Sequence, residues 1–269
     1  MRGASRASLA QAGEQLSAVA QGRPAAKIGD ELFAVVALLD SEHGLRRLLS
    51  DPARPAAAKA QMIRGLLDGK VTTATLDLVA WLVSARWSVP RDLGDATEEL
   101  GVLAFVIAAE RAGQLDDTED DLFRFGRVVA GQPKLRTALS DPALPATRKR
   151  ELLGALLDGK VSASAERLIT LAVMQPRGRS LDANLETYAR LTAERRERLV
   201  ALVRVASPLS QQQQRRLTAA LAGLYGHEIH LNVLLDPHVV GGMSVQVGDE
   251  LIDASVASRL AALRRRLAG

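Results

Sequence analysis

Residues Leu45–Val71 read LRRLLSDPARPAAAKAQMIRGLLDGKV, and residues Leu135–Val161 read LRTALSDPALPATRKRELLGALLDGKV. The two segments align without a gap at an offset of 90 residues, and 16 of the 27 aligned positions are identical. The match continues upstream, where residues 30–33 (DELF) align with residues 120–123 (DDLF). Self-similarity at a fixed spacing is the signature of a duplicated structural unit. The chain therefore contains two copies of one unit.

Each copy has the pattern of short amphipathic helices. The triplets Ser50-Asp51-Pro52 and Ser140-Asp141-Pro142 predict helix ends, because proline disfavours helical geometry in the residue before it. Gly69 and Gly159 are expected to cap the following helices in the left-handed conformation. An apolar stripe precedes each glycine, and short connections between such helices are typical of antiparallel bundles. The stripe residues are Met62, Ile63, Leu66 and Leu67 in the first copy, and Leu152, Leu153, Leu156 and Leu157 in the second.

The first residues of the chain fit the same repeat. In register, Met1–Gly22 occupies the place of the helix expected around Glu98–Gly113 in the second copy. The segment also contains Arg2, Ser5, Arg6 and Ser8 and few acids, which faintly resembles a transit peptide. The repeat register explains it better, so we expect a helix.

After residue 200 the pattern changes from helical to mixed. Val200–Ser207 and Glu228–Asp236 alternate like strands, and residues 243–247 form a third alternating run. Ser210 is expected to cap a helix over Gln211–Tyr225, and Ser255 a final helix. The predicted fold class is therefore mostly α: an N-terminal helical bundle built from the duplicated unit, followed by a small C-terminal α+β module.

Composition excludes several kinds of chemistry. The 269 residues contain no cysteine, which rules out disulfides and thiolate catalysis. The longest apolar run, Val102–Ala109, is much shorter than the ~20 residues that cross a bilayer. The net charge of +4 comes from arginines interleaved with acids, which is typical of solvated helix faces. No nucleophile–base–acid set is recognisable, so we expect neither an enzyme nor a cofactor.

Four local motifs have structural explanations that we favour. Residues Gly154–Lys160 fit seven positions of a phosphate-binding loop, but Val161 stands where a magnesium-binding Ser or Thr is required. His227 and His230 have the wrong spacing for a helical zinc site. The acidic run Asp116–Asp121 is interpreted as a loop and the first turn of a helix. Clustered arginines near the C-terminus leave nucleic-acid binding open, although no Phe or Trp follows residue 200 to stack bases.

The tail then resembles a known family. Its pattern is similar to the C-terminal signature of the delta subunit of bacterial F-type ATP synthases, the family called oligomycin-sensitivity-conferring protein in mitochondria. The residues that carry it, by contact with the stalk or through the fold, are Asp236, Gly241, Gly242, Gly248, Asp253, Ser255, Arg259 and Leu260. Upstream, the helical-domain motif is matched by Ser140, Asp141, Pro142 and Lys149.

The resemblance covers roughly residues 96–269 and implies an organisation. Residues 1–95 would be an extra N-terminal helical repeat, 96–195 the family's helical domain, and 196–269 a stalk-binding α+β module. The family's members are stator subunits: the helical domain binds N-terminal segments of the alpha subunits, here in a groove of residues 96–190, and the tail binds the b subunits. Such a protein would sit at the cytoplasmic face of the bacterial plasma membrane through its complex, without nucleic acid. A helical adaptor or an Arg-rich nucleic-acid-binding protein is the alternative.

Overall fold

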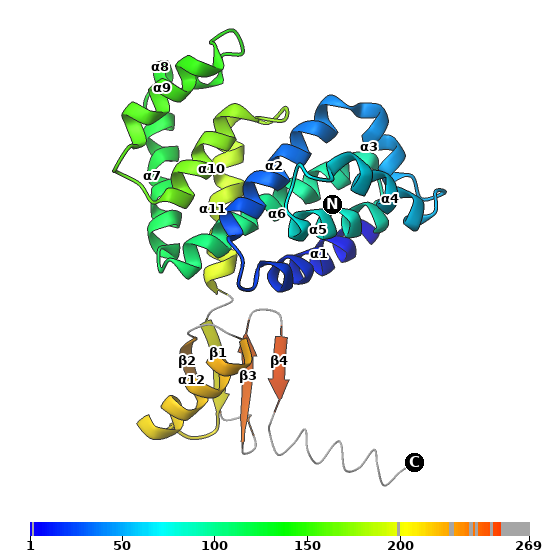
Figure 1. Ribbon diagram of the computed structural model, residues 1–269. Coiled ribbons are helices and arrows are strands. Elements are labelled where there is room, and N and C mark those ends of the chain that lie inside the picture. Colours follow the sequence, from blue (N-terminus) through cyan, green and yellow to red (C-terminus); the bar gives the residue numbers. More distant parts are fainter. Residues whose placement is uncertain are drawn as a thin grey trace. The chain divides into compact units, whose positions relative to one another are not determined.

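The computed structural model describes residues 1, 3–197, 200–225, 229–236, 239, 242–247 and 250–253. The chain divides into two compact units, Met1–Thr192 and Ala193–Gly269, and each is described by itself. No helix in the described ranges is both long and apolar enough to cross a membrane. The predicted fold class is confirmed: a helical half precedes a module that contains a small sheet (Figure 1).

The first unit is formed by consecutive helices. They are α1 (Ala4–Ala20), α2 (Ala25–Ser41), α3 (His43–Ser50), α4 (Ala56–Leu67), α5 (Thr73–Ser84), α6 (Pro90–Arg111), α7 (Leu115–Gly131), α8 (Pro133–Ser140), α9 (Ala146–Leu157), α10 (Ala163–Met174) and α11 (Leu181–Glu197). In Figure 1 the helices of the first copy lie on one side of α6 and those of the second copy on the other.

The duplication is complete at the level of helix bounds. Adding 90 to the bounds of α2–α5 gives the bounds of α7–α10, for example Ala25–Ser41 and Leu115–Gly131. The same shift places α1 on α6, as the register of the first residues predicts, and α6 on α11. The helix α6 is thus the last helix of the first copy and the first helix of the second. The boundary proposed between residues 95 and 96 falls inside this continuous helix.

The predicted helix ends are confirmed in both copies. The helices α3 and α8 end at Ser50 and Ser140, and the following aspartates adopt extended geometry. Gly69 and Gly159 have φ values of 68° and 66°, the left-handed conformation that glycine adopts without steric cost. The caps of α5 and α10 also correspond, because the backbone N–H of Thr72 donates to Glu31 and that of Ser162 donates to Asp121.

The closest packing in the first unit joins α2 to α6. The ring of Phe105 lies over Gly29, where an added Cβ would stand 2.7 Å from the ring, and the ring of Phe33 lies over Gly101, at 2.8 Å. The two ring centroids are 6.3 Å apart. Because neither glycine has a side chain, two aromatic rings fit between helices that would otherwise be held apart. Phe33 and Phe105 are 1% and 2% exposed.

Two details of the helical prediction are corrected. The stripe before Gly69 buries Ile63 and Leu67, but Met62 is 42% exposed, because the stripe of a short helix is narrower than four residues require. The acidic run Asp116–Asp121 is not a loop, since all of it lies in α7. Asp116 and Asp117 occupy the first turn of α7, where negative charge favours the helix dipole.

The second unit contains β1 (Val200–Val205), α12 (Gln211–Tyr225), β2 (His230–Leu235), β3 (Met243–Val247) and β4 (Glu250–Asp253). The sheet order is β2-β1-β3-β4; β1 pairs parallel with β2 and antiparallel with β3, which pairs antiparallel with β4. The parallel pair requires a crossover, and α12 supplies it. Ser210 caps α12 reciprocally with Gln213, as predicted for this position.

The core of the second unit lies on one face of the sheet. Its buried members are Ala201, Val203, Val205, Leu221, Ile229, Val245 and Val247. The alternation in Glu228–Asp236 predicts one apolar face with Ile229, Leu231, Val233 and Leu235. That prediction is partly wrong, because Leu235 is 61% exposed at the end of β2. The final helix expected from Ser255 lies outside the described residues.

Candidate functional site at the junction of the two helical repeats

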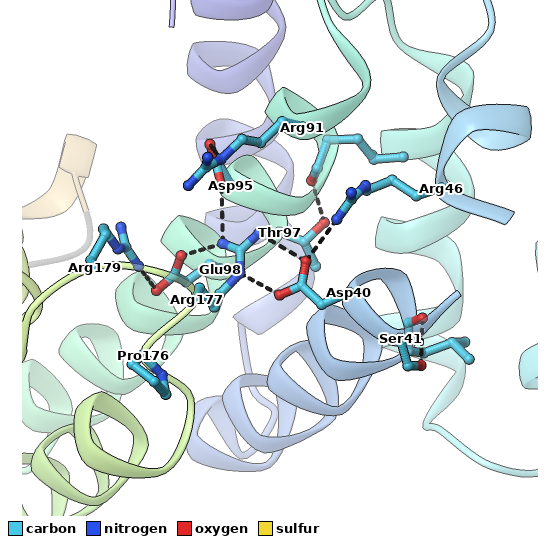
Figure 2. A network of polar contacts seen from close by, with 12 residues as sticks. Asp40, Ser41, Arg46, Arg91, Asp95, Thr97, Glu98, Pro176, Arg177 and Arg179 are labelled. Carbon is cyan, nitrogen blue, oxygen red and sulfur yellow. Dashed lines mark hydrogen bonds and ion pairs between the residues drawn. The ribbon is translucent and has the colours of Figure 1, made fainter. Parts of the chain in front are cut away.

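A buried carboxylate, Glu98 of α6, is the centre of a polar network (Figure 2). The guanidinium groups of Arg177 and Arg179 both donate to it. The hydroxyl of Tyr188 on α11 donates to the same carboxylate at 3.0 Å. A buried charge is tolerated only when it is paired and hydrogen-bonded, and Glu98 has three such partners. The network therefore ties the α10–α11 loop and α11 to α6.

Arg177 extends the network into the first copy. Its Nε donates to Asp40 at the end of α2 at 2.6 Å, and its Nη1 lies 3.1 Å from Asp95. Asp40 also accepts from Arg46 of α3 at 3.0 Å. The side chain of Arg177 is only 7% exposed, and Gly94 leaves room for it, since a Cβ there would stand 2.9 Å from Nη2. One side chain thus joins α2, α6 and the α10–α11 loop.

The backbone of Arg177 is unusual as well. Its φ of 50° is left-handed, a conformation that costs a residue with a Cβ roughly 1–2 kcal/mol. Such geometry persists only where the surroundings impose it. The three carboxylates around the guanidinium supply that constraint.

The first copy makes the same connection with different chemistry. Ser5 and Ser8 of α1 stand 90 positions before Asp95 and Glu98. Ser5 accepts from the backbone N–H of Ser88 at 2.7 Å, and Ser8 donates to the carbonyl of Arg86 at 2.8 Å. Both copies therefore tie the loop before their last helix to their first helix. Serines and backbone groups do this in the first copy, and ion pairs do it in the second.

The network shifts the pKa of two of its members. Burial alone would lower the pKa of Arg177, but hydrogen bonds and charge from Asp40 and Glu98 more than offset it, and the pKa is raised. Burial and the neighbouring charge of Glu98 raise the pKa of Tyr188 above its usual value. Arg177 is therefore always charged, and Tyr188 stays a neutral donor far into the alkaline range.

Replacing Tyr188 with phenylalanine is expected to lower the free energy of unfolding by about 1–2 kcal/mol at neutral pH, because a hydrogen bond to a charged group is lost. The unfolded tyrosine releases its proton near pH ~10, whereas the folded one keeps it. The advantage of the native chain over the variant is present below this pH and shrinks as pH rises above it. Denaturant titrations on both sides of pH ~10 measure the difference; Tyr225→Phe, outside the network, is the control. A difference that grows above pH ~10 would contradict the assignment.

The helical-domain motif residues surround the end of α8. Ser140 is its last residue, and the carboxylate of Asp141 accepts from the backbone N–H of Ala143 at 2.8 Å, which fixes the turn that contains Pro142. Lys149 on α9 is 9% exposed. Its first-copy counterpart, Lys59, donates to the carbonyl of Asp51 at 3.3 Å. Burial lowers the pKa of Lys59, and the carboxylate of Asp51 offsets part of that effect. These positions organise a turn and its packing, and a partner contact for them stays a prediction.

The tail motif residues are described only in part. The backbone N–H of Asp236 donates to Val205 at 2.9 Å, and Gly242 has a φ of 78° just before β3. Asp253 ends β4 opposite Ser244. Gly241, Gly248, Ser255, Arg259 and Leu260 lie outside the described residues, and so do His227 and the C-terminal arginines.

The structure assigns the phosphate-loop match to a helix end. Residues 154–157 are the last turn of α9 and follow helix rather than a strand, and the Lys160 ammonium donates to the carbonyls of Ala155 and Leu156 at the end of α9. Among the described residues, no three His, Asp or Glu side chains come together as a metal site. The arrangement defines a class of protein: a doubled helical bundle joined in sequence to a small α+β module.

Comparison with known proteins identifies the family. The sequence model of the ATP synthase delta (OSCP) subunit matches residues 103–267. ATP synthase subunit delta of Thermobifida fusca is 50% identical over 100% of both chains, and that of Streptomyces griseus is 52% identical, also over 100% of both. The chain therefore belongs to the ATP synthase delta (OSCP) subunit family. It is a structural, non-catalytic subunit of an ATP synthase, as the sequence resemblance predicts.

The Glu98 network was not predicted from the sequence. Glu98 and Arg177 are 79 positions apart, and each is surrounded by other charges that look solvent-facing. A signal was nonetheless available in the repeat. The second copy has arginines at 177 and 179 where the first has Trp87 and Val89, and it has Glu98 where the first has Ser8. Residues that are neutral in the first copy are therefore charged in the second on both sides of the contact, and this paired change marks the junction.

Proposed function

We propose that this chain is the stator connector of a bacterial F-type ATP synthase. Its helical half holds the catalytic head through N-terminal segments of the alpha subunits, and its C-terminal module, residues 196–269, holds the b subunits. Torque on the rotor would otherwise turn the head with it. The observation that supports this role is that this chain, a member of the family, contains two separately packed units. A connector needs two attachments, and each unit can supply one of them. The family assignment favours this role over an unrelated adaptor or a nucleic-acid-binding protein.

The proposed groove for an alpha-subunit helix lies within residues 96–190. The helix α6 offers little of it, because fourteen of its 22 residues are buried and α2 covers the face that contains Gly101 and Phe105. On α7, by contrast, Phe123 is 62% exposed and Val128 is 39% exposed. Amphipathic helices dock by burying such residues. We therefore place the alpha contact on the exposed face of α7.

Location follows from the same proposal. The chain would lie peripherally at the cytoplasmic face of the plasma membrane, attached through the complex. Affinity purification of the full chain from native membranes tests the whole proposal, and the alpha, beta and b subunits are expected to accompany it. Recovery of the chain without them, under conditions that preserve the complex, would refute the connector role.

Replacing Phe123 with serine is expected to weaken binding of an alpha-subunit N-terminal peptide to the full chain by about tenfold, because one large apolar contact is lost. Fluorescence polarisation with a labelled peptide measures the affinity. The matched control is Leu224→Ser, which removes a side chain that is 67% exposed in the second unit. Equal affinities for Phe123→Ser and the native chain would place the alpha contact elsewhere and leave the co-purification result untouched.

A further inference from the structure

Each helical copy has a cleft at the same place. In the first copy a cleft of about 570 Å³ lies between the end of α3 with its following turn and the loop before α6. In the second copy a cleft of about 490 Å³ lies between the end of α8 and the start of α11. Ser50 and Asp51 line the first, and Ser140 and Asp141 line the second. The position is a property of the repeat, but the two linings differ.

The first cleft has an apolar floor and rim. Trp87 is 5% exposed, and its indole N–H donates to the carbonyl of Leu82 at 2.8 Å, so only its ring remains to contact a ligand. Val89 at the rim is 51% exposed. The corresponding residues of the second copy are Arg177 and Arg179, which belong to the network around Glu98. The second cleft therefore has neither the indole nor the exposed valine, and the apolar residue in its lining is the 5% exposed Leu181.

The first cleft is also lined by cations that have little to bind. Within the described part of the chain, Arg47 has no ion-pair partner, and Arg54 approaches Asp51 only at 3.8 Å with its side chain 53% exposed. The Asp51 carboxylate is already engaged by the backbone N–H of Ala53 at 2.9 Å. The residues that correspond to Arg47 and Arg54 in the second copy are Thr137 and Leu144. The second cleft keeps one arginine, Arg136, which approaches the carboxylate of Asp182 in the same lining at 3.9 Å. Two arginines beside Trp87 and Val89 line the first cleft.

We propose that this first-copy cleft, lined by Arg47, Arg54, Trp87 and Val89, binds an acidic peptide segment of a partner protein that inserts one bulky apolar side chain. The apolar side chain contacts Trp87 and Val89, and the flanking carboxylates lie against the two arginines. Arginine and tryptophan are the residues that most often dominate such contacts, and the charges select acidic segments and favour their approach. The residues that line the cleft come before residues 103–267, the part of the chain that the family model matches. The cleft would therefore give the extra copy a binding role of its own.

Peptide binding to the full chain tests the charge requirement. The probe is a fluorescein-labelled peptide of glutamates and leucines, and the comparison is the same peptide with glutamines in place of the glutamates. The acidic peptide is expected to bind more tightly, and its affinity to fall with salt. Arg47→Glu combined with Arg54→Glu is expected to weaken it by about tenfold or more. Thr137→Glu, at the equivalent site of the second cleft, is the matched control and should leave binding unchanged.

Several outcomes would overturn the inference. They are equal binding of the glutamine peptide, an equal loss in Thr137→Glu, and complete displacement by free glutamate at the same carboxylate concentration, which would indicate an anion site only. Val89→Glu changes an exposed position, so the fold should not be affected. This variant should also weaken binding of the acidic peptide.

The assembled complex provides the second test. A photo-crosslinking amino acid in place of Val89 is expected to attach to an acidic segment of a neighbouring subunit, identified by mass spectrometry, with a yield that Arg47→Glu lowers severalfold. Attachment only to neutral or basic segments, or no attachment, would refute the inference. If the chain still co-purified with the other subunits, the proposed function would stand without it.

Discussion

Replacing Arg177 with alanine is expected to lower the free energy of unfolding of the helical unit by about 3 kcal/mol. The substitution leaves Asp40 and Glu98 without their shared cation, and breaking a buried pair by removing one partner typically costs ~3–5 kcal/mol. Arg179 and Tyr188 still contact Glu98, which places the expected loss at the lower end of that range. Chemical denaturation of the full chain, followed by far-ultraviolet circular dichroism, measures it.

Two further variants separate the causes of this loss. Arg177→Gly removes the same ion pairs but accepts the φ of 50°, so it is expected to be about 1 kcal/mol milder than Arg177→Ala. Arg91→Ala removes an arginine whose side chain is 65% exposed and 3.6 Å from Asp95, and it should cost less than ~0.5 kcal/mol. If Arg177→Ala cost no more than Arg91→Ala, the network would not stabilise the junction.

Replacing Gly101 with alanine is expected to destabilise the helical unit by about 2 kcal/mol, although alanine usually favours a helix. Its Cβ would stand 2.8 Å from the Phe33 ring, and overpacking of this kind costs ~1–3 kcal/mol. The larger Gly101→Leu, which imports the residue found at the equivalent position 191, should cost more than the alanine variant. Thermal or chemical unfolding of the full chain measures both effects.

The control for this prediction has the opposite sign. Beyond the adjoining residues and backbone of α4, Gly65 has no described atom within 4 Å of the position its Cβ would take. Gly65→Ala should therefore stabilise the chain by about 0.5–1 kcal/mol through helix propensity alone. Equal stabilisation by Gly101→Ala would mean that α2 and α6 are not held at the distance described.

The repeat made most of the fold predictable. Local signals such as Gly69, Gly159 and Ser210 act within a few residues of the chain, and they fixed helix ends that the structure reproduces. Long-range pairing has no such local signal. Glu98 resembles any acid on a helix until Arg177, in a loop of the other copy, is placed beside it, and burial of such a charge depends on the whole packing.

The two phenylalanines show why a sequence match does not guarantee the same environment. Phe33 and Phe123 occupy equivalent positions, yet the first is 1% exposed and the second 62%. The difference follows from their neighbours, because Gly29 and Gly101 are replaced by Glu119 and Leu191 in the second copy. Without the two glycines the helices cannot interlock, and Phe123 stays at the surface, where Arg127 approaches its ring.

The helix α6 has a mechanical consequence. Its 22 residues span about 33 Å of unbroken hydrogen-bonded backbone, and both bundles use it as one of their walls. Bending one bundle against the other would require a kink in that rod as well as the rupture of side-chain contacts. A force applied sideways to either bundle is therefore transmitted to the other through one continuous helix. The second copy lengthens the subunit, and α6 connects the two copies without a flexible linker.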